Sequence, residues 1–154
     1  MPGLTTPVYS CINWNTWPKL PNCGAINIAI SKATITVILP TLNEKGHIVE
    51  LIKEIQAVFS ASNQNYEIIV VDDNSKDGTI DLIKKIENDH DNLQLFVREN
   101  LKKNLAKSIN LGIKKSKYEN IIWMDADFQH PPDHIKLFYT YQKSYDVVVF
   151  SRFL

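Results

Sequence analysis

Short apolar runs alternate with amphipathic segments along most of the chain. Five of the runs predict β-strands, and the first of them, TITVIL, is rich in β-branched residues. Between them, apolar side chains recur at helical spacing, which predicts amphipathic helices that each bury one face. The predicted strands cover residues 34–39, 67–71, 93–97, 121–124 and 146–151.

Amphipathic segments follow the first four predicted strands. The first helix is expected to start at Glu44 with Asn43 as its cap, and Asp133 is expected to cap the last one. The second runs to about residue 88, and the third covers 101–117. The predicted buried faces are Ile48, Leu51, Ile52, Ile55 and Phe59 in the first helix, Ile80, Ile83 and Ile86 in the second, Leu105, Ile109 and Ile113 in the third, and Ile135, Phe138 and Tyr141 in the fourth.

This alternation of strands and helices is typical of an α/β fold. We expect a mainly parallel sheet with helices on both faces, joined by right-handed crossovers. Residues 1–33 do not share the pattern, and they hold four of the seven prolines and two of the three tryptophans. We therefore divide the chain into an irregular N-terminal leader, 1–33, and one domain, 34–154.

Charge and hydropathy exclude several classes of protein. Lysine plus arginine equals aspartate plus glutamate at 17 each, so we expect no nucleic-acid partner. No apolar run approaches the roughly 20 residues of a membrane-spanning helix, and no secretory signal opens the chain. We expect a cytoplasmic protein. Peripheral contact with the cytoplasmic face of a membrane remains compatible with the sequence. Cys11 and Cys23 lack a zinc-binding pattern, and reduced thiols are favoured over a disulfide.

The stretch 121–132, IIWMDADFQHPP, places two carboxylates directly after an apolar run. The double proline ends the strand because it cannot continue a ladder. Asp125, Asp127 and Gln129 therefore lie at a strand end, where α/β folds bind ligands. Oxygen ligands of this kind suit Mg2+ or Mn2+, which in turn binds a diphosphate. A polar turn after a strand is the alternative interpretation.

Polar clusters follow three of the predicted strands. They cover residues 40–44, 72–74 and 125–129. In a parallel sheet these strand ends open on the same edge. The five carboxylates there would repel one another unless a cation or hydrogen-bond donors were bound, which favours a ligand site.

Four segments, in this order and spacing, resemble the family 2 glycosyltransferases, which are inverting nucleotide-sugar enzymes with the GT-A fold. The segments are VILPTLNE, YEIIVVDDNSKDGT, MDADFQHPP and DVVVFSRF, and the resemblance spans 34–153. Within this family the chain resembles the dolichyl-phosphate and polyprenyl-phosphate glycosyltransferases. The resemblance implies a donor such as GDP-mannose or a UDP-sugar and a polyprenyl or dolichyl phosphate acceptor.

The resemblance also implies roles for individual residues. Asp73 and Val71 match the residues that hold the nucleobase, whereas Asp72 is expected to be structural. Asp127, which holds the metal, and Arg152, at a phosphate, are the expected catalytic residues. The implied metal ligands are Asp125, Asp127 and Gln129, and the implied nucleotide-sugar site is Pro40, Leu42, Glu44, Val71, Asp73, Asp125, Ala126, Asp127 and Gln129.

The implied chemistry is metal-dependent transfer of a sugar with inversion. Charge develops on the departing nucleoside diphosphate, and a divalent ion stabilises it. A phosphate acceptor is already ionised near neutral pH, so no strong general base is needed. Neither His130 nor His134 is placed by a motif as such a base.

Two departures from the family pattern leave alternatives open. Residues 104–108 read NLAKS where relatives have a glycine-rich stretch, and relatives continue well beyond SRF. We expect a domain that is incomplete at the C-terminus, so a non-catalytic nucleotide-sugar-binding module is the alternative function. A receiver-like regulatory domain is disfavoured because its paired acids and its lysine are missing. Lysines cover the third helix, either as a solvated face or for an acidic membrane surface or ligand.

Overall fold

The computed structural model describes residues 10–13, 34–62, 64–99, 102–141, 145 and 147–151. The chain divides into two compact units. The core unit comprises residues 32–135, and the terminal unit combines 1–31 with 136–154. The predicted functional residues, apart from Arg152, belong to the core unit.

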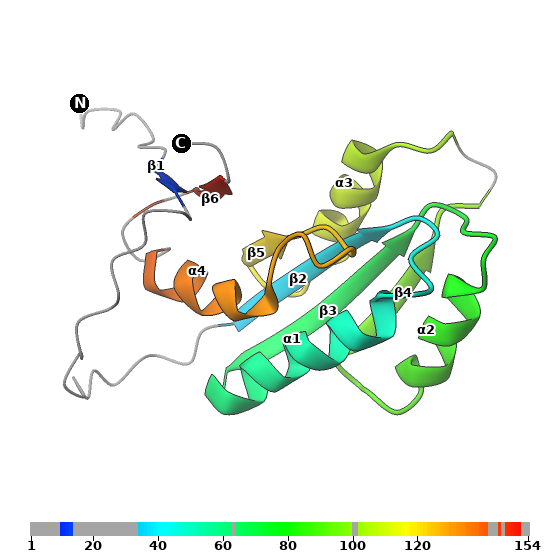
Figure 1. The fold of residues 1–154 in the computed structure, drawn as a ribbon, viewed down its shortest axis with the longest axis horizontal. Coiled ribbons are helices and arrows are strands. Elements are labelled where there is room, and N and C mark those ends of the chain that lie inside the picture. Colours follow the sequence, from blue (N-terminus) through cyan, green and yellow to red (C-terminus); the bar gives the residue numbers. More distant parts are fainter. Residues whose placement is uncertain are drawn as a thin grey trace. The chain divides into compact units, whose positions relative to one another are not determined.

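The core unit is built on a four-stranded parallel sheet (Figure 1). Its strands are β2 (Thr34–Thr41), β3 (Asn65–Asp72), β4 (Leu93–Val97) and β5 (Asn120–Trp123), in the spatial order β4-β3-β2-β5. The chain steps outward from β2 to β4 and then returns to the other side of β2. This reversal creates a switch point between β2 and β5, where open α/β sheets bind ligands at the carboxyl ends of their strands.

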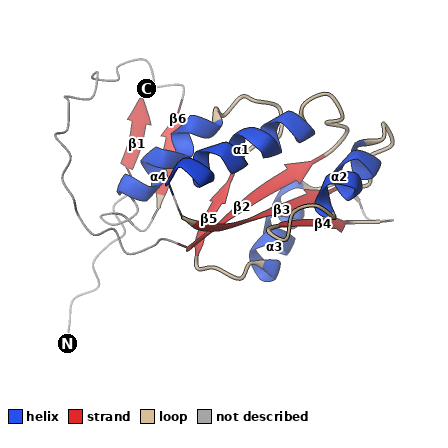
Figure 2. Ribbon diagram, turned by 90° about the horizontal axis from the view of Figure 1, so that it is seen from below, coloured by secondary structure: helices blue, strands red, loops and turns tan. Residues whose placement is uncertain are grey.

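Helices cover both faces of this sheet (Figure 2). The outward steps use α1 (Ile48–Ser62) and α2 (Thr79–Glu87) on one face, and the return step uses α3 (Leu105–Lys115) on the other. Right-handed crossovers require this arrangement, because the direction of stepping reverses. β2 lies between both layers and is buried from Ile35 to Thr41. The predicted fold class, a parallel sheet with helices on both faces, is confirmed.

The predicted apolar face of α1 is confirmed, but its predicted cap is wrong. Ile48, Leu51, Ile52, Ile55 and Phe59 are fully buried. Asn43 instead adopts a left-handed conformation, with φ 58°, and its side-chain oxygen accepts the backbone N–H of Lys76. The sequence around a helix start cannot show that the Asn43 side chain binds a loop that lies more than thirty residues further along the chain.

The first strand was predicted to end at residue 39, before Pro40, yet β2 continues through Pro40 to Thr41. The C=O of Thr41 accepts the N–H of Asp73 on the β3 side, whereas the C=O of Ile38 accepts the N–H of Met124 on the β5 side. Pro40 therefore turns its missing N–H toward β5, whose pairing with β2 has ended at Ile38. The proline costs no ladder hydrogen bond there.

The predicted buried face of α3 is wrong. Its buried residues are Ser108 and Gly112, while Leu105 is 53% exposed and Ile113 is 45% exposed. A methyl group at Gly112 would lie 2.6 Å from Cγ2 of Ile38. The helix therefore approaches the sheet through small residues, which leaves part of its apolar stripe outside the core.

This close approach makes Gly112→Ala a destabilising substitution. Alanine in a helix gains about 1 kcal/mol over glycine, but overpacking a core costs about 1–3 kcal/mol. We expect a net loss of about 1 kcal/mol in the free energy of unfolding, measured by urea denaturation. Gly46 has no atom within 4 Å of an added methyl group, so Gly46→Ala is the matched control and should cost nothing. Equal stabilities for the two variants would contradict the tight contact.

The described part of the terminal unit contains a second, two-stranded sheet. Its strands, β1 (Ser10–Asn13) and β6 (Val148–Ser151), pair in parallel. The sequence predicts the strand at 146–151 but assigns it to the main sheet, and it predicts no strand within 1–33. A strand propensity is local, whereas the pairing partner here is more than a hundred residues away. The remaining helices are η2 (Pro132–His134) and α4 (Ile135–Tyr141).

Candidate nucleotide-sugar site

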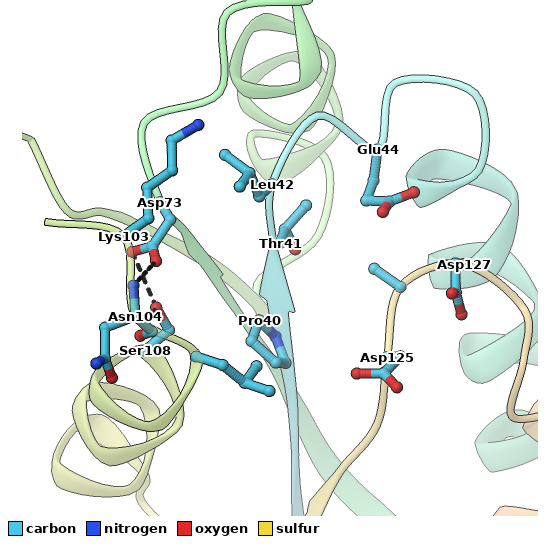
Figure 3. Close-up of a pocket in the computed structure, with 12 residues that line it drawn as sticks. Pro40, Thr41, Leu42, Glu44, Asp73, Lys103, Asn104, Ser108, Asp125 and Asp127 are labelled. Carbon is cyan, nitrogen blue, oxygen red and sulfur yellow. Dashed lines mark hydrogen bonds between the residues drawn. The ribbon is translucent and has the colours of Figure 1, made fainter.

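A pocket of about 360 Å³ opens at the carboxyl edge of the core sheet (Figure 3). It lies at the switch point and is lined by the ends of β2, β3 and β5 and by the start of α3. Seven predicted site residues line it: Pro40, Leu42, Glu44, Asp73, Asp125, Ala126 and Asp127. The other lining residues, which the motifs do not assign, are Thr41, Lys103, Asn104, Leu105 and Ser108.

Three predicted site residues are not part of this lining. Val71 is fully buried and packs with Ile38 and Ile69 beneath the pocket. Gln129 is exposed and contacts Asp127. Arg152 lies outside the described residues.

One wall of the pocket is acidic. It is formed by Glu44, after β2, and by Asp125 and Asp127, after β5 (Figure 3). Burial raises the pKa of Glu44 above its usual value, and repulsion from Asp127 raises this pKa further. His47 offsets part of the rise in pKa. These carboxylates are therefore close enough to repel one another, as the sequence predicts for this edge.

The loop after β5 fixes the orientation of the Asp127 carboxylate. Its oxygens accept the backbone N–H of Gln129 at 3.0 Å and the side-chain amide of Gln129 at 2.6 Å. Phe128 adopts a left-handed conformation, with φ 61°, and its ring stands edge-on to that of His47. In the same loop, Nδ1 of His130 lies 3.9 Å from Oδ2 of Asp125.

The described residues contain no group of three or more side chains arranged to hold a metal ion. Mg2+ is usually bound through one or two carboxylates, with water and substrate phosphates completing its shell. Asp125 and Asp127 line the same pocket and provide that smaller set. The donors therefore fit an ion that is bound jointly with a diphosphate, rather than one caged by protein alone.

The opposite wall is organised around Asp73, at the end of β3. Its Oδ2 accepts the backbone N–H of Asn104 at 2.8 Å, and its Oδ1 accepts the Ser108 hydroxyl at 2.9 Å. The guanidinium of Arg98 also donates to Oδ1, and both side chains are almost fully buried. Asp73 therefore ties the end of β3 to the residue after β4 and to the start of α3.

Arg98, which contacts Asp73, is not assigned by any of the motifs. One of its guanidinium nitrogens also donates to the Asn104 carbonyl at 3.0 Å and to the Ser108 hydroxyl at 2.9 Å. Its only signal in the sequence is that it follows a predicted strand, as Asp73 and Asp125 do. The carboxyl edge of the sheet therefore contains a buried arginine side chain as well as its carboxylates.

Asp72 has a different set of contacts from Asp73. It is fully buried, and its two oxygens accept the backbone N–H and the hydroxyl of Ser75 at 2.7 and 2.6 Å. The Ser75 oxygen in turn accepts the backbone N–H of Asn43 at 2.7 Å. These contacts hold the loop after β3 against the loop after β2.

The comparisons with known proteins point to one family. The model of "Glycosyl transferase family 2" matches residues 36–154. A dolichol-phosphate mannosyltransferase of Pyrococcus furiosus is 32% identical over 78% of this chain and 33% of its own length. An undecaprenyl-phosphate 4-deoxy-4-formamido-L-arabinose transferase of Yersinia pestis is 32% identical over 80% of this chain and 38% of its own length. The chain thus spans about a third of the length of these curated relatives.

Solved structures support the same fold. A mannosyltransferase from Pyrobaculum calidifontis, in complex with GDP-Man and Mn2+, is 30% identical, with a TM-score of 0.52. The match covers 60% of this chain and 27% of that one. The core unit therefore has the GT-A fold that the sequence motifs predict.

Proposed function

Since the chain belongs to the glycosyl transferase family 2, we propose that its pocket binds a nucleoside-diphosphate sugar together with Mg2+ or Mn2+. The sugar is then transferred, with inversion, to a polyprenyl or dolichyl phosphate. The names of the two curated relatives, a dolichol-phosphate and an undecaprenyl-phosphate transferase, support this class of acceptor. For the donor, we propose either GDP-mannose or a UDP-sugar.

The observation that carries the proposal is the division of the pocket into two walls. The acidic wall suits a divalent ion and the diphosphate bound to it. The opposite wall offers Asp73, whose Oδ2 accepts one protein N–H, from Asn104. A carboxylate oxygen can accept two hydrogen bonds, so Oδ2 has capacity for the ring N–H of uracil or guanine.

In this proposal Asp125 and Asp127 hold the ion, and the Asp127 carboxylate is oriented by Gln129. When bound, the ion supplies a Lewis acid for the charge on the leaving diphosphate. Asp73 orients the nucleotide, and Arg152 is proposed to hold the acceptor phosphate, because a planar guanidinium matches phosphate oxygens. An ionised phosphate attacks without a protein base.

The second candidate function is a nucleotide-sugar-binding module without turnover. It is considered because the described pocket residues are assigned only to the donor and its ion, which such a module would also bind. Both functions use the same pocket, so they differ only in whether an acceptor is glycosylated.

A transfer assay separates the two functions. The protein is incubated with radiolabelled GDP-mannose or UDP-glucose, Mn2+ and a polyprenyl phosphate, and lipid-soluble label is extracted. We expect labelled glycosyl phospholipid with one donor, and Asp127→Asn should abolish it. If a donor binds but neither donor gives a labelled lipid product, the chain is a nucleotide-sugar-binding module without turnover.

A further inference from the structure

One side of the core unit concentrates positive charge. Residues 102–118, which contain α3 and its flanking turns, hold six lysines and no aspartate or glutamate. The whole chain has a formal net charge of zero, so this charge is local. All six side chains are exposed: Lys102, Lys103, Lys107, Lys114, Lys115 and Lys117.

The same side carries exposed apolar side chains. Among the described residues of the core unit, the exposed large hydrophobic residues are Leu105, Ile113 and Trp123. Trp123 is 49% exposed and pairs in register with Ile38, against which Gly112 of α3 packs. Trp123 therefore lies on the face of the sheet that α3 covers. We call α3, its flanking lysines and Trp123 the basic face.

We propose that the basic face docks on the surface of an anionic lipid bilayer. Lysines next to a bilayer are attracted to anionic headgroups. A tryptophan and aliphatic side chains beside them can insert at the boundary between headgroups and acyl chains, where tryptophan is enriched. A helix face that is merely solvated needs no exposed apolar residues. This surface has both the lysines and the apolar side chains that binding to a bilayer requires.

The docked orientation has a consequence for the pocket. Lys103 and Leu105, which belong to the basic face, also line the pocket. Docking would therefore bring the mouth of the pocket close to the headgroups, where a lipid-linked phosphate resides. Membrane docking itself does not depend on the proposed glycosyl transfer, because it can be measured without any nucleotide.

The test is co-sedimentation of the 154-residue chain with vesicles. We expect binding to phosphatidylcholine vesicles that contain phosphatidylserine, little binding to phosphatidylcholine alone, and release by salt. Lys107→Glu with Lys114→Glu, both on the basic face, should weaken the partitioning by more than about tenfold. Lys84→Glu with Lys85→Glu makes the same charge change on α2, across the sheet, and should leave it unchanged.

Trp123 provides a second readout. In a Trp14→Phe, Trp17→Phe background it is the remaining tryptophan, and its emission should shift to shorter wavelength with anionic vesicles. Ile113→Ser should weaken binding without changing the net charge. The proposal is overturned if both lysine pairs have equal effects, if anionic vesicles leave Trp123 emission unchanged, or if single-stranded RNA binds the basic face and vesicles do not.

Discussion

Replacing Arg98 by methionine is expected to lower the free energy of unfolding by about 3–5 kcal/mol, because the partner of a buried charge is removed. The Arg98 side chain is 4% exposed and that of Asp73 is 9% exposed. Without the guanidinium, the Asp73 carboxylate keeps only neutral donors, from Asn104 and Ser108. The carbonyls of Asn104 and Lys102 would also lose a donor.

Urea denaturation followed by circular dichroism measures this loss. Lys85→Met removes a positive charge from the exposed last turn of α2, and it should cost less than about 1 kcal/mol. Asp73→Asn in the Arg98→Met background removes the stranded charge, so the double variant should be less destabilised than the two single losses added together. A small loss for Arg98→Met, equal to that of Lys85→Met, would mean that the pair is not buried in solution.

Replacing Asp127 by asparagine is expected to remove the metal-dependent part of nucleotide binding. The change keeps the size of the side chain and one oxygen that can accept the N–H of Gln129, but it removes the charge that would hold the ion. Loss of an outer-shell partner weakens metal sites about 10- to 100-fold, so loss of a direct ligand should weaken Mn2+-dependent GDP or UDP binding by at least about 100-fold.

The matched control for this change is Asp81→Asn. Asp81 is exposed in the first turn of α2 and does not line the pocket. We expect it to leave both the affinity and the metal dependence unchanged. If Asp127→Asn and the control bind nucleotide equally well with Mn2+, then Asp127 does not hold the ion.

The sequence was sufficient to predict the four strands of the main sheet and the edge at which polar side chains converge. Each strand of the main sheet is a short apolar run that hydrophobic patterning detects, and alternation with helices implies parallel pairing. Asp73, Asp125 and Glu44 follow three such runs, so their convergence follows from topology. The structure brings these side chains to one pocket.

The contacts that cross between elements could not be predicted in this way. Arg98 has no motif, and its partners are contributed by β3 and by α3. The buried face of α3 is defined by Gly112 against Ile38, where the small size of a residue matters more than its hydrophobicity. The pairing of β6 with β1 could not be predicted either, because a propensity for extended structure does not specify which strand lies beside it.

The most direct test of the account is a calorimetric titration of the wild-type chain with GDP and with UDP, in Mn2+ and again in excess chelator. The central claim is that carboxylates from separate strand ends hold a divalent ion and a nucleoside diphosphate together. We predict that one nucleotide binds in Mn2+ and that its binding is lost or greatly weakened in chelator. Equal affinities in the two buffers, or no binding of either nucleotide in Mn2+, would contradict the claim.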